Sequence, residues 1–117
     1  MNYSKTTVMG EQKNILANTH YTAINKKVAK SIATSNVIKA GTVINTDGTV
    51  LANGAESSAI TKSVLGIVLY DIDVTNEAGT NVVIPVLTHG TVIEEAAKNG
   101  TEYSADVKKA LPQILFV

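Results

Sequence analysis

The chain changes character near residue 36, where a polar amino-terminal stretch gives way to short runs of β-branched residues separated by turns. Val, Ile and Thr fill these runs, and their branched side chains suit a pleated strand better than a helix. The Asp47-Gly48 pair between two runs predicts a hairpin, because such a turn needs a residue with positive φ. The first strands are therefore expected at 37–38, 42–44 and 49–51.

The most apolar run extends from Val64 to Tyr70 and leads into a segment at 71–75 where polar and apolar side chains alternate. Alternation of this kind is typical of a strand with one face in solvent. A return strand is predicted at 82–87, continuing at 91–93. It contains Pro85, which has no N–H to donate, so we expect an edge strand or a bulge there.

Two short helices are predicted after these strands. The first spans 94–99, with Thr91 as its cap and two glutamates in its first turn. The second is capped by Ser104 and stops before Pro112. The chain ends on four apolar residues that we expect to be buried in a last strand or at a contact between subunits. These candidate self-association residues are Ile114, Leu115, Phe116 and Val117.

Composition limits how the domain can be stabilised. The 117 residues suffice for one domain and an arm, and the absence of Cys excludes disulfides and thiolate metal sites. With one Phe, four Tyr and no Trp, the core must be aliphatic. Small domains without such cross-links often oligomerise. We predict a mainly β fold, a small β-sandwich or tulip-like barrel with one or two short helices and an extended amino-terminal arm.

The net charge of zero conceals an asymmetry along the chain. Residues 1–39 contain six lysines and one glutamate, whereas residues 40–117 contain four lysines and nine acidic residues. Every basic residue is Lys, which lacks the planar fork of Arg that recognises phosphates and base edges. Nucleic-acid binding is therefore disfavoured, and the amino-terminal stretch is interpreted as an electrostatic docking element.

These patterns divide the chain into a basic arm at 1–35 and a β-rich domain at 36–117. Ile24, Val28 and Ile32 recur at a spacing of four, which fits a short amphipathic helix over 23–33. The other interpretation is an arm that becomes ordered only on a partner. The candidate docking residues are Lys5, Lys13, Ile24, Lys26, Lys27, Val28 and Lys30.

Side chains suited to catalysis are sparse. Asp71 and Asp73 could share a strand face and act as a carboxylate pair on a sugar, but a solvated strand face is the simpler interpretation. The two histidines lack zinc-ligand spacing, and phosphate-loop and serine-nucleophile motifs are missing. We expect no enzyme activity, no cofactor and no metal. The hairpins also resemble those of biotinyl or lipoyl carrier domains, but Lys62 lacks the flanking residues that such domains modify.

The start of the chain lacks the apolar stretch of a signal peptide, and no run is long enough to span a membrane. We therefore expect synthesis in the cytoplasm and no membrane partner.

The order of segments resembles the head decoration proteins of tailed phages of the lambda type and the related head-fibre proteins. The resemblance covers 36–117 and depends on Ala-Gly-Thr-Val at 40–43, the runs at 64–75 and 82–92, a short acidic helix, a Lys-rich turn and the apolar end. It implies a homotrimer that binds the major capsid protein at local threefold sites and stabilises the expanded shell.

The resemblance further implies an amino-terminal segment that orders on the capsid. The expected location is the outer capsid surface of the virion, after synthesis in the host cytoplasm. The alternative is a carbohydrate- or host-binding β module of a phage fibre.

Overall fold

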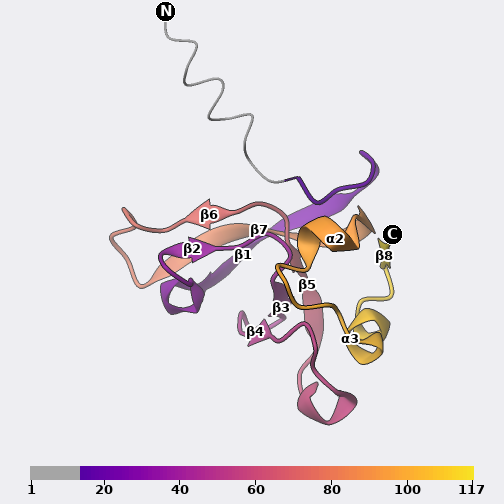
Figure 1. The fold of residues 1–117 in the computed structure, drawn as a ribbon. Coiled ribbons are helices and arrows are strands. Elements are labelled where there is room, and N and C mark those ends of the chain that lie inside the picture. The colour runs from indigo at the N-terminus through magenta and orange to yellow at the C-terminus, as the bar shows by residue number, and fades with distance from the viewer. Residues whose placement is uncertain (1–13) are drawn as a thin grey trace, which may run out of the picture.

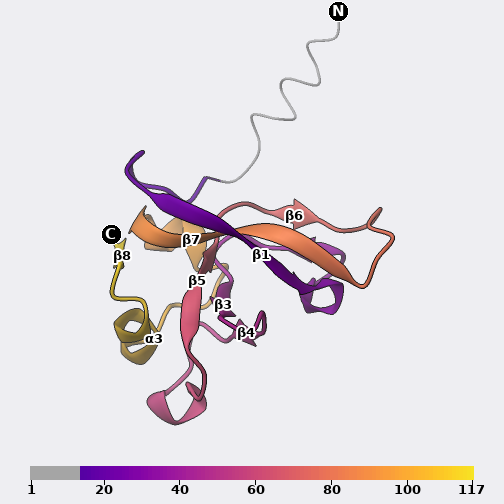
Figure 2. The same ribbon diagram turned by 180° about the vertical axis from the view of Figure 1, so that it is seen from behind.

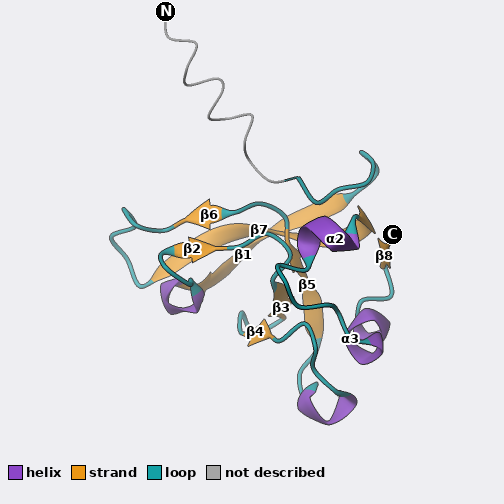
Figure 3. Ribbon diagram, viewed as in Figure 1, coloured by secondary structure: helices purple, strands orange, loops and turns teal. Residues whose placement is uncertain are grey.

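The computed structural model describes residues 14–117, and short strands account for most of their regular structure (Figures 1 and 3). The strands are β1 (Thr22–Ala29), β2 (Val37–Ile38), β3 (Val43–Asn45), β4 (Val50–Leu51), β5 (Val64–Val68), β6 (Ile72–Asp73), β7 (Asn81–Val92) and β8 (Ile114–Phe116). The helical segments are α2 (Glu94–Ala97), α3 (Ala105–Ala110) and the single 3-10 turns η1 (Lys30–Ile32) and η2 (Ser57–Ala59). The prediction of a mainly β fold with short helices is confirmed.

Strand β7 organises the larger sheet, whose order is β1-β7-β5-β3-β4. It runs antiparallel to β1 along nearly its whole length, and Figure 2 shows the two strands side by side. A register shift between Thr22 and Ala23 leaves Thr88 of β7 without a partner in β1, which makes a bulge. Beyond this bulge, β7 pairs in parallel with β8. One strand thus holds the amino-terminal and carboxy-terminal strands together.

The position of Pro85 corrects the expectation of an edge strand or a bulge at that residue. Pro85 lies in register opposite Asn25, and β7 is flanked on its other side by β5. The Pro85 carbonyl accepts a hydrogen bond from Leu69 N at 3.1 Å, just past the end of β5. The ring nitrogen of Pro85 faces β5, as this carbonyl does. It has no hydrogen to donate, but it lies opposite Leu69, where the pairing with β5 has already ended. An interior strand therefore tolerates the proline.

Both faces of the sheet are buried at its centre, because neighbouring residues of β3, β5 and β7 point to opposite faces. One face packs on α2, α3 and β8, and we call this cluster the helix-side core. Its buried members are Ile15, Ala40, Val43, Leu51, Ala55, Ile67, Leu69, Leu87, Val92, Ala97, Tyr103, Val107, Leu111 and Ile114. This two-sided burial accounts for the continuous apolar run before Tyr70.

The other face packs between β1, β7 and the small sheet of β2 and β6, which lies across them in Figure 1. We call this cluster the strand-side core. Its buried members are Val28, Ile38, Ile44, Val68, Val74, Val82, Ile84 and Val86. The two layers that enclose it form a small sandwich at this end of the molecule.

The local signals for turns and caps are mostly confirmed. Gly48 has a φ of 91° and donates its N–H to Asn45 O, so the β3–β4 turn has the predicted positive φ. Ser104 caps α3, its hydroxyl oxygen accepting from Val107 N at 3.1 Å. The predicted cap of α2 is wrong: Thr91 lies within β7, and Ile93 precedes the helix without a side-chain cap.

The helix suggested over 23–33 is also wrong, because these residues form β1 and the single turn η1. A spacing of four is even, so Ile24 and Val28 share one face of a strand just as they would share one face of a helix. Eight register pairs with β7 select the strand. The sheet therefore begins at Thr22, within the segment that was predicted to be an arm.

Candidate docking and association surfaces

Strand β1, an outer strand of the larger sheet (Figure 2), contains two adjacent lysines, Lys26 and Lys27. Lys26 lies opposite Ile84 on the face of the strand-side core, and Lys27 lies opposite the exposed Val83 on the other face. Neither ammonium group forms an ion pair within residues 14–117. Lys30 follows in η1, and its ammonium group donates to Glu77 O. The strand thus carries uncompensated positive charge on both of its faces.

On its outer side the backbone of β1 pairs with no strand among residues 14–117. Lys30 N donates to Thr80 O at 2.8 Å. Because the backbone groups of successive residues point to opposite sides of a strand, the N–H and C=O groups of the even-numbered residues of β1 face β7. The N–H and C=O groups of Asn25 and Ala29 therefore face away from the sheet. The β3–β4 turn lies close to the outer side of Lys27, because a Cβ added to Gly48 would be only 3.3 Å from Lys27 O.

The other docking candidates fall in different places. Ile24 is exposed on β1, whereas Val28 is 2% exposed and belongs to the strand-side core. Lys5 and Lys13 lie outside the described residues. The structure therefore brings Ile24, Lys26, Lys27 and Lys30 together on one strand and the turn that follows it.

The carboxy-terminal residues divide between the core and the surface. Ile114 and Phe116 point into the helix-side core, where the ring of Phe116 lies 4.7 Å from that of Tyr103. Leu115 and Val117 are each 62% exposed. Val117 N donates to Val92 O, and Glu94 N donates to Val117 O, which places the exposed Ile93 beside Val117. We call Ile93, Leu115 and Val117 the carboxy-terminal patch.

This patch and the β1 lysines form separate surfaces. β1 pairs with β7 over Asn81–His89, whereas β8 pairs with it only over Gly90–Val92. An apolar contact and a charged contact can therefore be made at the same time.

The two aspartates considered for catalysis stabilise the backbone. Asp71 Oδ1 accepts from Ala40 N at 2.7 Å, and Asp73 Oδ1 accepts from Thr75 N at 2.9 Å. The hydrogen bonds from Thr75 lower the pKa of Asp73 below its usual value. Each carboxylate thus fixes a loop next to β2 or β6.

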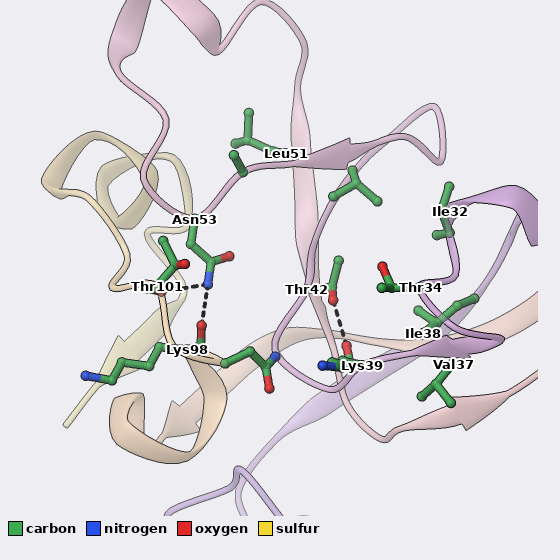
Figure 4. A pocket seen from close by; sticks show the side chains of 13 residues that line it. Ile32, Thr34, Val37, Ile38, Lys39, Thr42, Leu51, Asn53, Lys98 and Thr101 are labelled. Carbon is green, nitrogen blue, oxygen red and sulfur yellow. Dashed lines mark hydrogen bonds between the residues drawn. The ribbon is translucent and has the colours of Figure 1, made fainter.

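A groove that the sequence did not reveal lies between β4, β2 and the α2–α3 loop, with a volume of about 360 Å³ (Figure 4). Asn53 forms part of its wall, where Nδ2 donates to Lys98 O and Thr101 O at 3.0 Å each. The only signal in the sequence was the pair of Asn-Gly turns at 53–54 and 99–100, which are too common to identify a site.

Comparisons with protein-family models, with curated proteins and with solved structures find no match. Within residues 14–117, no three His, Asp or Glu side chains gather where a metal ion could bind. Over the same residues, no helix is long and apolar enough to cross a bilayer.

Proposed function

We propose that this chain is a decoration protein of a tailed-phage head. It binds the major capsid protein on the outer surface and stabilises the expanded shell, as a homotrimer at local threefold sites. The observation that carries the proposal is that the ammonium groups of Lys26 and Lys27, on an outer strand, form no ion pair within residues 14–117. They continue the basic charge of the residues before them, and the order of segments from residue 36 onward resembles that of decoration proteins.

The charge on β1 suits a partner with an acidic surface. Exposed ion pairs contribute only about 0.2–1 kcal/mol each, so a single copy would bind weakly. Three linked copies raise the effective concentration of each remaining contact, which converts weak contacts into stable attachment. Such attachment weakens as salt rises, because exposed charges are screened over about 8 Å at 0.15 M ionic strength.

The carboxy-terminal patch supports the association of copies. Full burial of an aliphatic side chain contributes about 1.5–3 kcal/mol, and three such side chains are exposed together here. Leu115 lies on β8, which pairs with β7, and Val117 is held by its backbone hydrogen bonds to Val92 and Glu94, so little ordering is required on association.

Capsid binding can be tested with expanded shells that lack this chain, taken from the phage that encodes it. Replacing Lys26 and Lys27 by Gln should weaken binding at least about tenfold and reduce its salt dependence. Lys109→Gln on α3, also exposed, is the control and should bind like the unmodified chain. Equal binding and equal salt dependence of all three proteins would contradict the role of β1.

The oligomeric state can be tested by light scattering after size exclusion. We expect the mass of a trimer for the full chain and of a monomer for the Leu115→Ser, Val117→Ser variant, with unchanged circular dichroism. A monomer at every concentration, or a trimer that both serines leave intact, would exclude the carboxy-terminal patch as the contact.

A carbohydrate- or host-binding module of a phage fibre is the second candidate. Sugar faces commonly stack on exposed aromatic rings, and among residues 14–117 only Tyr21 offers such a ring. The structure therefore contains no observation that favours this function over decoration.

A further inference from the structure

The groove beside β4 has an apolar floor and a polar rim. Ile38 and Leu51 are buried beneath it, and Val50, 43% exposed, stands at its side. In Figure 4, Asn53, Thr101 and Lys98 line one end, Ile32, Thr34 and Ile38 line the other, and Lys39 and Thr42 lie between them. The groove is therefore long and open rather than a closed pocket for a compact ligand.

One wall of the groove is formed by β4, whose outer edge pairs with no other strand in the described part of the chain. β4 is the last strand of the larger sheet. Asn45 N donates to Thr49 O at 2.8 Å, so the next pair along the hairpin, Ile44 and Val50, is not hydrogen-bonded. The N–H and C=O groups of Val50, a residue that lines the groove, consequently point away from β3. An extended peptide could add to this edge as a further strand.

The charge of the rim selects the kind of peptide. The residues that line the groove include two lysines and no acidic residue. The Lys98 ammonium group is already 3.2 Å from Glu95 Oε1, whereas Lys39 is exposed and forms no ion pair within the described part of the chain. Thr42, beside Lys39, is held by donating its hydroxyl to Lys39 O at 2.7 Å. Lys39 therefore offers the groove a cation that no ion pair within residues 14–117 engages, on a residue that lies between the two ends of the groove in Figure 4.

We propose that this groove binds an extended acidic segment of another protein, which adds to β4 as a strand. Its backbone pairs with Val50, one apolar side chain rests on Ile38 and Leu51, and a neighbouring carboxylate meets Lys39. The site is distinct from the β1 lysines and the carboxy-terminal patch, and it does not depend on the partner being a capsid.

The test uses the full chain, labelled with nitrogen-15, and the probe acetyl-Thr-Val-Asp-Val-Thr-amide. Matched probes carry Asn or Lys in place of the Asp, and a fourth carries N-methyl groups on the edge that would pair with β4. The aspartate probe should shift amide signals of Val50, Leu51, Ile38 and Lys39. It should bind about fivefold more tightly than the Asn probe, the upper value for an exposed ion pair. The N-methylated probe should not bind.

A protein variant distinguishes the contribution of the Lys39 charge to binding from that of the rest of the groove. Lys39→Gln should abolish the preference for Asp over Asn while leaving the affinity for the Asn probe unchanged, and Lys109→Gln should preserve the preference. Signal shifts at other sites, equal affinities for the Asp, Asn and Lys probes, or no shift at millimolar probe would each overturn the proposal. Because no capsid is present, these outcomes are independent of the decoration function.

Discussion

The two cores of this molecule are stabilised in different ways. The helix-side core contains a buried ring, Tyr103, whose hydroxyl lies 2.6 Å from Gly41 O and 3.1 Å from Ala97 O. The strand-side core has no aromatic residue and consists of Val and Ile side chains from strands and their flanks. The first core depends on polar contacts between loops that are distant in the chain, and the second depends on aliphatic volume alone.

This difference indicates which substitutions each core tolerates. Volume-conserving exchanges of aliphatic residues usually cost less than about 1.5 kcal/mol, so the strand-side core has many acceptable sequences. A buried carbonyl that loses its donor costs about 1–3 kcal/mol whatever replaces the donor. The helix-side core is therefore expected to be the less tolerant of the two, and four changes test this comparison.

Gly41→Ala should have the largest effect, because it forces apart the contact between the 39–42 loop and α2. Gly41 has a φ of 91°, and a Cβ there would overlap the carbonyl of Ala97. We expect a loss of about 4 kcal/mol or more in the free energy of unfolding, measured in urea. Gly100→Ala is the control: its φ is 87° with nothing within 4 Å of a Cβ, so only about 1–2 kcal/mol should be lost. Equal losses would show that the contact with α2 is unimportant.

Ile84→Ala should be the most damaging simple truncation in the strand-side core. Ile84 is fully buried, and the cavity left by its removal should cost about 3 kcal/mol. Ile84→Val should cost only about 1 kcal/mol in the same urea titration. A Val variant as unstable as the Ala variant would mean that shape, and not only volume, matters in this core.

Tyr103→Phe removes the polar contact of the helix-side core while keeping its volume. We expect a loss of about 1–2 kcal/mol at neutral pH, because the Gly41 carbonyl loses its side-chain donor, whereas the Ala97 carbonyl still accepts from Asn99 Nδ2. Burial, and to a smaller degree Glu94, raises the pKa of Tyr103 well above 10.0. The protonated hydroxyl thus stabilises the fold below pH about 10, and this stability is lost as pH rises beyond it. The Phe variant should show a flatter profile in that alkaline range.

Lys62→Gln should have the smallest effect, and only in acid. The Lys62 ammonium group, 2.8 Å from Asp47 Oδ2, holds the pKa of Asp47 well below 3.8, with help from Thr49. A lowered pKa stabilises the folded state above pH about 4 and is lost as pH falls further. The β3–β4 turn that carries Asp47 also covers Val28 of the strand-side core.

The acid-unfolding midpoint of Lys62→Gln should therefore move to slightly higher pH when followed by circular dichroism. Lys109→Gln serves as its control and should keep the midpoint of the unmodified chain. A midpoint that the loss of Lys62 leaves in place would show that the ion pair with Asp47 does not stabilise the folded state in acid.

Local chemistry made much of the fold predictable. Asp47-Gly48 marked the hairpin, Ser104 marked the start of α3, and branched residues marked the strands, because each effect acts within a few residues. Long-range effects were not predictable. Whether Pro85 lies at an edge depends on where β5 ends, and whether residues 22–29 form a strand depends on a partner far along the chain.

The candidate surfaces were predictable only in part. The clustering of lysines in the sequence pointed to β1, but not to a strand, and the apolar end of the chain did not reveal that Leu115 and Val117 face outward. The groove could not be foreseen, because it is assembled from β2, β4 and the α2–α3 loop, which are far apart in sequence.

The central place of β7 has a consequence for how the protein is made. β1 leaves the ribosome well before Asn81–Val92, and at about 5–20 residues per second it waits several seconds for its partner. During this interval β1 is open to pairing with other chains, and lysines on an edge oppose such pairing. We therefore expect Lys26 and Lys27 to hinder aggregation of the newly synthesised chain until β7 is available.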